Sequence, residues 1–157
     1  MKFPIFVPIN KIIMWKRIQT LYLAISTGLI ISLFFCRFAT DPGSIGDDAV
    51  IRYYEKTSYL LMLIMLLTAN VFAISTFKTP MLQARVSIIS ALALLGFQIW
   101  LGIDFFMYRS LMTFSVTMLF PILGSFMNFL AGRNAMIDGF TIQAVQRRKN
   151  QAKHKKK

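Results

Sequence analysis

A chain of 157 residues that is 56% hydrophobic leaves little sequence for more than one folded domain. Its formal net charge of +12 would suggest nucleic acid as a partner in a water-soluble protein, but the cations lie outside four charge-free segments. The composition therefore predicts one membrane domain, and the single cysteine, Cys36, excludes an intramolecular disulfide.

The four charge-free segments have the length of transmembrane helices. They cover residues 18–36, 57–77, 86–103 and 110–132. About 20 apolar residues cross a membrane, because a helix rises about 1.5 Å per residue and the hydrocarbon core is about 30 Å thick. We therefore predict an all-α, four-helix transmembrane bundle within residues 14–132.

The N-terminal residues 1–13 contain Pro4 and Pro8, so we expect a short non-helical extension there. Met14 offers a second plausible start of the chain. Lys16 and Arg17 then form a cationic collar at the membrane surface.

The first segment carries small residues every four positions, at Ala24, Gly28 and Ser32. Such a stripe lets another helix approach closely, so we expect it to be a packing surface.

The connection at residues 37–56 is the longest between two segments. It holds Asp41, Asp47 and Asp48, whose carboxylates could bind a divalent cation, but the residue spacing of a calcium loop is absent. We therefore expect a solvated loop. In the fourth segment, Pro121 lies near the middle and predicts a kink in the helix.

No titratable side chain lies inside the four segments, which disfavours a proton relay in the membrane. The strongly polar intramembrane residues are Asn70, Gln98 and Asn128. Their amides either form buried hydrogen bonds between helices or build a polar site that faces the cytoplasm.

We predict no catalytic, cofactor-binding or metal-ligating residue. The only histidine, His154, lies in a lysine-rich tail, and no hydroxyl at membrane depth has an evident activating base. Glycine-rich phosphate loops are also missing. We therefore expect a protein that is not an enzyme and has no cofactor.

Residues 133–157 form a basic tail. Together with the cationic collar it supplies candidate contacts for anionic lipid headgroups: Lys16, Arg17, Arg147, Arg148, Lys149, Lys153, Lys155, Lys156 and Lys157. Nucleic acid is a weaker candidate, because no aromatic side chain is interleaved among these cations for base stacking.

The distribution of cations predicts the orientation of the bundle. The two tails and the middle connection carry 14 lysines and arginines, whereas the other two connections carry 4. Because positive charge stays on the cytoplasmic side during insertion, both termini are expected in the cytoplasm.

Residues 14–23, and above all the run Arg-Ile-Gln-Thr-Leu-Tyr-Leu at 17–23, resemble the opening of a family of small bacterial membrane proteins of unknown function. Arg133, Asp138 and Arg147 resemble that family's charged helical stretch, although Gly139 replaces an acidic residue usual there. The resemblance covers residues 14 to about 148. It implies four spans and no catalytic residue.

These patterns favour a structural or accessory subunit that contacts the lipid bilayer and either itself or another membrane protein. The alternative is a small transporter or channel with a polar path near Asn70 and Asn128.

Overall fold

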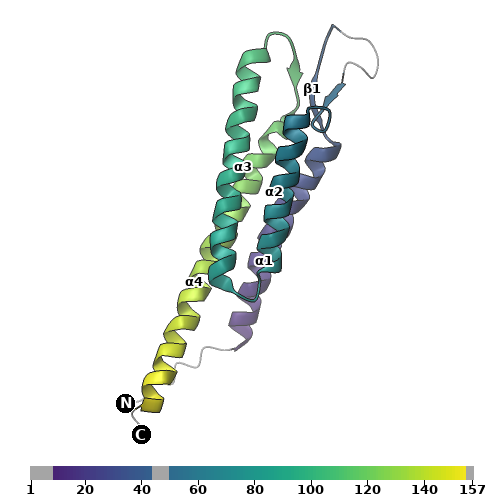
Figure 1. The fold of residues 1–157 in the computed structure, drawn as a ribbon. Coiled ribbons are helices and arrows are strands. Elements are labelled where there is room, and N and C mark those ends of the chain that lie inside the picture. The colour runs from purple at the N-terminus through teal and green to yellow at the C-terminus, as the bar shows by residue number, and fades with distance from the viewer. Residues whose placement is uncertain (1–8, 44–49, 155–157) are drawn as a thin grey trace.

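The computed structural model describes residues 9–43 and 50–154. The described residues form four long helices, which are α1 (Ile9–Phe35), α2 (Thr57–Ser75), α3 (Pro80–Tyr108) and α4 (Phe120–His154). All four are long and apolar enough to cross a membrane, which confirms the predicted all-α four-helix bundle. Figure 1 shows that α1 begins and α4 ends at one end of the bundle. We call it the terminal end, and the opposite end the sheet end.

Each helix packs against two neighbours with a regular spacing of buried residues. Helices α1 and α3 both pack against α2 and α4. Along α2 the buried positions alternate by four and three residues, as Tyr59, Leu63, Leu66, Asn70 and Ala73. This mean spacing of about 3.5 residues is typical of left-handed coiled-coil packing. Large apolar side chains on the outer faces, such as Leu61 and Ile64, are exposed, as contact with lipid tails requires.

The start of α1 differs from the sequence prediction. Helix α1 begins at Ile9, directly after Pro8, so residues 9–13 are helical and not part of a non-helical tail. A proline just before a helix removes no helical hydrogen bond. Residues 1–8 lie outside the described residues.

Only the second part of the fourth predicted segment, residues 110–132, forms an α-helix. Residues 110–115 hold a turn and a strand, and the short 3-10 helix η2 (Val116–Leu119) leads into α4. Pro121 is therefore the second residue of α4, where its missing backbone donor costs no helical bond. The predicted kink in the middle of a helix is wrong.

Three short strands cover the sheet end: β1 (Arg37–Thr40), β2 (Val50–Arg52) and β3 (Thr113–Phe114), paired antiparallel in the order β2-β1-β3. The ring of Phe38 on β1 is 1% exposed. It makes edge contacts with the rings of Tyr53, Tyr59 and Phe114. The expected solvated loop is thus wrong for these residues, because a folded sheet joins the core of the bundle. Asp47 and Asp48 lie outside the described residues.

Helix α4 approaches α3 closely at glycines. A Cβ atom at Gly132 would lie 2.9 Å from Cγ1 of Ile88 and 3.3 Å from the carbonyl oxygen of Ala84. At Gly139 it would meet the flexible side chain of Met81 at 2.8 Å. The absence of a side chain at these positions therefore sets the α3–α4 contact.

The small-residue stripe on α1 has no such role within this chain. Ala24 and Gly28 are exposed, and a Cβ atom at Gly28 would meet no atom within 4 Å. Ser32 is partly buried and donates to the carbonyl oxygen of Leu29 in its own helix. The expected packing against another helix is not found in the bundle.

Candidate functional site

One polar side chain from each helix meets inside the bundle. The four residues are 0% exposed and are Ser26 on α1, Asn70 on α2, Ser90 on α3 and Asn128 on α4. Asn70 Nδ2 donates to Ser26 Oγ at 3.2 Å, and Ser90 Oγ donates to Asn70 Oδ1 at 2.8 Å. Asn128 Nδ2 donates to Asn70 Oδ1 at 2.7 Å and to Ser90 Oγ at 3.0 Å. We call these four residues the polar layer, and Asn70 is its centre because it bonds to the other three.

One further hydrogen bond connects the polar layer to the backbone of a neighbouring helix, because Ser26 Oγ donates to the carbonyl oxygen of Gly124 at 3.1 Å. Beside the layer, Ser125 Oγ on α4 donates to the carbonyl oxygen of Ala91 on α3 at 2.8 Å. Hydrocarbon offers no hydrogen-bond partner, so polar groups at this depth must find partners within the protein. The layer therefore links all four helices.

The polar layer contains no titratable group. Amides and hydroxyls neither gain nor lose a proton near neutral pH, so these residues can position and bind but cannot act as a general acid or base without an activating partner.

The three amides singled out in the sequence lie in two different environments. Asn70 and Asn128 come together, whereas Gln98 lies closer to the sheet end of α3 and is only partly buried. Its Oε1 atom has no hydrogen-bond partner among the described residues. Gln98 lines a hollow of about 280 Å³ together with Phe105 and Phe114.

Unpartnered polar atoms continue from the layer toward the terminal end. Asn128 Oδ1, Ser87 Oγ and Gln83 Nε2 are buried and have no hydrogen-bond partner among the described residues. Ser87 precedes Ser90 by three residues and Gln83 precedes Ser87 by four, so all three lie on one face of α3. This spacing of four and three residues is visible in the sequence, but Gln83 is not among the polar residues predicted above.

A second pair joins α1 and α4 near the terminal end. Gln19 Nε2 donates to Asp138 Oδ2 at 2.6 Å, and Gln19 is 2% exposed. The two residues belong to the opening run and the charged stretch on which the family resemblance was based. A bond to a carboxylate is stronger than one between neutral groups, so this pair fixes α1 against α4.

The sheet ends of α2 and α3 are joined around Asp104. Tyr59 Oη donates to Asp104 Oδ2, and Lys56 Nζ lies 3.7 Å from the same oxygen. The Lys56 ammonium also lies over the rings of Phe38, Tyr59 and Tyr108, at 5.0, 4.9 and 5.7 Å from their centroids. Attraction between a cation and aromatic faces adds to the ion pair and holds this end together.

Tyr53 is fully buried beneath the sheet. Its hydroxyl lies beside Thr117 and has no hydrogen-bond partner among the described residues. Burial disfavours the charged phenolate and raises the pKa of Tyr53 to about 12.

The candidate lipid contacts lie near the terminal end or beyond the bundle. Gly139 packs against Met81, the second residue of α3, so residues 140–154 of α4 continue past α3, as Figure 1 shows. Arg147 and Arg148 are exposed on this protruding helix. The structure describes only the helical backbone of Lys16, Arg17, Lys149 and Lys153, while Lys155, Lys156 and Lys157 lie outside the described residues.

The sequence model of one family, described as a domain of unknown function, DUF4293, matches residues 15–147. The chain belongs to this family. The DUF4293 domain includes the whole polar layer, Gln19 and Asp138, and it confirms the resemblance to a family of unknown function. No curated protein and no solved structure matches the chain.

Proposed function

We propose that this DUF4293 protein is a non-enzymatic structural or accessory subunit of a bacterial inner membrane. The observation that carries the proposal is that the polar layer links the four helices, because Asn70 and Asn128 are 0% exposed and bond to other helices. Amides engaged in this way stabilise helix packing and leave few groups for chemistry.

The protruding part of α4 supports a role in recruiting a partner. Residues 140–154 extend about 22 Å beyond the start of α3 at 1.5 Å per residue. The described side chains from residue 143 onward are exposed, with Arg147 and Arg148 among them. A basic helix at a membrane surface attracts anionic lipid headgroups or an acidic surface of another protein.

The same charges support an orientation with both termini in the cytoplasm. A reporter that is active only in the periplasm, fused after Lys157, should be silent, whereas one fused within residues 41–43 should be active. Activity of the C-terminal fusion would overturn this orientation.

Purification in a mild detergent tests the subunit role. We expect the full chain to migrate as part of a larger assembly, with itself or with a second membrane protein. A monomer without any co-purifying protein, after cross-linking in intact cells as well, contradicts the proposal.

Transport is the competing outcome, and substitution of the two asparagines distinguishes it. Asn70→Leu and Asn128→Leu in liposomes should change the stability of the bundle without abolishing any solute flux. Loss of flux with unchanged or raised stability would instead identify these residues as the lining of a polar path.

A further inference from the structure

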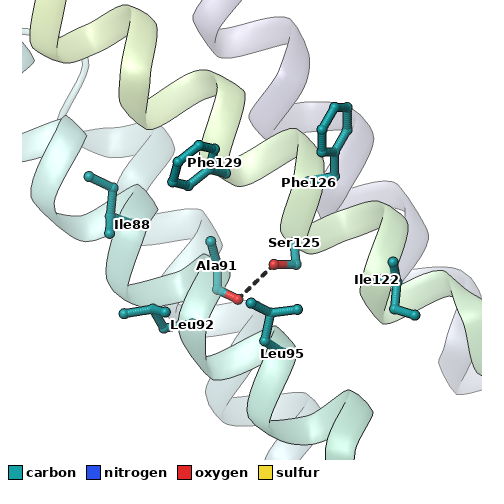
Figure 2. Close-up of a pocket in the computed structure, with 8 residues that line it drawn as sticks. All are labelled: Ile88, Ala91, Leu92, Leu95, Ile122, Ser125, Phe126 and Phe129. Atoms are coloured by element: carbon teal, nitrogen blue, oxygen red, sulfur yellow. Dashed lines mark hydrogen bonds between the residues drawn. The ribbon is translucent and has the colours of Figure 1, made fainter.

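An apolar groove opens between α3 and α4 on the membrane-facing side of the bundle. It has a volume of about 320 Å³, and Figure 2 shows its walls. The α3 wall is formed by Ile88, Leu92 and Leu95, and the α4 wall by Ile122, Phe126 and Phe129.

The floor of the groove is polar but already satisfied. Ser125 Oγ donates to the carbonyl oxygen of Ala91, the bond drawn as a dashed line in Figure 2. An occupant therefore meets no free hydrogen-bonding group there and must itself be apolar. Because Leu92 is 62% exposed on the rim, the groove is open along its length to whatever surrounds the helices.

Two arginines lie at the terminal end of this groove, one from each wall. Arg85 precedes Ile88 by three residues on α3, and Arg133 follows Phe129 by four on α4. Side chains three and four residues apart lie on the same face of a helix, so both arginines continue the groove walls.

The two arginines also lie at the same height along the bundle. A Cβ atom at Gly132 would lie 3.3 Å from the carbonyl oxygen of Ala84, and these residues directly precede Arg133 and Arg85. Both arginines are exposed, and among the described residues neither forms an ion pair. Two guanidinium groups without a carboxylate partner make a site for an anion, and guanidinium binds phosphate oxygens in a bidentate manner.

The dimensions of this site are those of one membrane leaflet. Arg85 lies 19 residues before Asp104 on α3, or about 28 Å, so the two charged positions fit the two surfaces of a hydrocarbon core about 30 Å thick. The distance along α3 from Arg85 to Leu95, where the groove ends, is about 15 Å, half of that thickness. An acyl chain anchored at the arginines would end where the groove ends.

We infer that the α3–α4 groove binds one anionic glycerophospholipid, with its phosphate between Arg85 and Arg133 and an acyl chain along Leu92 and Phe126. The inference does not depend on the accessory role or on which leaflet faces the cytoplasm. It differs from a general attraction to the protruding helix, because it requires one bound lipid at one place.

Native mass spectrometry of the full chain tests this site. The detergent-purified protein is titrated with phosphatidylglycerol and with phosphatidylcholine of the same acyl chains, and we expect one phosphatidylglycerol to be retained in preference. The variant Arg85→Gln/Arg133→Gln should bind it about 30-fold more weakly, from the loss of two surface cations. The variant Arg147→Gln/Arg148→Gln loses the same charge outside the groove and should bind as the wild type does.

A second pair of variants tests the acyl chain. Leu92→Trp should fill the groove and weaken phosphatidylglycerol binding although both arginines remain. Leu61→Trp is the matched control, because Leu61 is also an exposed leucine, at 64%, but lies on α2. Circular dichroism and thermal unfolding in the same detergent should show that each variant is folded. If the double glutamine variant fails to fold, Arg85→Lys/Arg133→Lys keeps the charge and should still weaken binding by losing the bidentate contacts.

Four results would overturn the inference. They are equal retention of the two lipids, an equal loss in the two arginine double variants, and displacement of the lipid by inorganic phosphate at similar concentration. The fourth is a lipid-free dimer that Leu92→Trp converts to a monomer, because the groove would then hold a second copy of the chain.

Discussion

Replacing Asn70 tests whether the polar layer holds the bundle together. Asn70→Leu removes three interhelical hydrogen bonds, to Ser26, Ser90 and Asn128. An average hydrogen bond between membrane helices contributes about 0.6 kcal/mol, so the loss of three should lower the free energy of unfolding by at least about 2 kcal/mol. The two serines can turn to carbonyl groups of their own helices, which keeps the loss below about 4 kcal/mol.

Asn128→Leu should lower the free energy of unfolding by less than Asn70→Leu does, and this order of the two variants is the stricter test. The substitution removes two donated bonds, but it also removes Asn128 Oδ1, a buried acceptor without a partner among the described residues. Relief of that desolvation offsets part of the loss, so we expect a change below about 1 kcal/mol. The double variant should be more stable than the sum of the single changes predicts, since the Asn70–Asn128 bond is then counted once.

The free energy of unfolding can be measured in mixed micelles of dodecylmaltoside and sodium dodecyl sulfate. Thr68→Val is the matched control, because Thr68 is exposed on the same helix and donates only to its own backbone, at Ile64 and Met65. Asn70→Ala should reproduce the result of Asn70→Leu without added bulk. The reasoning is refuted if Asn70→Leu is as stable as this control, or if Asn128→Leu costs more than Asn70→Leu.

Three further predictions use the same unfolding assay. Gly132→Ala should cost about 1 to 3 kcal/mol because its Cβ has no room, whereas Gly28→Ala should gain up to about 1 kcal/mol; equal effects would contradict the close approach of α3 and α4. Tyr53→Phe should raise stability by about 1 kcal/mol at neutral pH by removing a buried, unpaired hydroxyl. Because the pKa of Tyr53 is raised from 10.0 to about 12, the wild type should also lose stability as the pH rises from 10 to 12, and an unchanged difference between the two proteins across that window would disprove the cause. Asp104→Asn weakens the bond from Tyr59 and should cost about 1 to 2 kcal/mol, with a loss that salt barely changes, since the ion pair with half-exposed Lys56 contributes little.

The spans were predictable because membrane insertion depends on local composition. The segment predicted at 57–77 corresponds to α2 at Thr57–Ser75, since only apolar residues tolerate hydrocarbon over that length. The same rule failed at residues 110–119, which are free of charge but form β3 and η2. Strands of two to four residues are too short for their alternation to be recognised, and the pairing of β1 with β3 joins residues about 75 positions apart.

The candidate site was predictable residue by residue but not as an arrangement. Asn70, Gln98 and Asn128 carry the same local signal, a polar amide in an apolar segment. Two of them meet, while Gln98 borders a hollow at the sheet end. The difference comes from the rotation of each helix about its axis, which depends on packing with helices distant in sequence.

Polar contacts have a greater influence on this bundle than their number suggests. Lipid tails are as apolar as leucine, so burial of leucines does not by itself favour one rotation of a helix over another. Helix α4 has glycine contacts with α3 to fix its position, whereas among the described residues the side-chain hydrogen bonds from α2 to other helices come from Asn70 and Tyr59. These two residues are separated by 11 positions, or about 16 Å, one in the polar layer and one at the sheet end. Two fixed points on one rigid helix constrain both its rotation and its tilt, so Asn70 and Tyr59 together favour one register of α2.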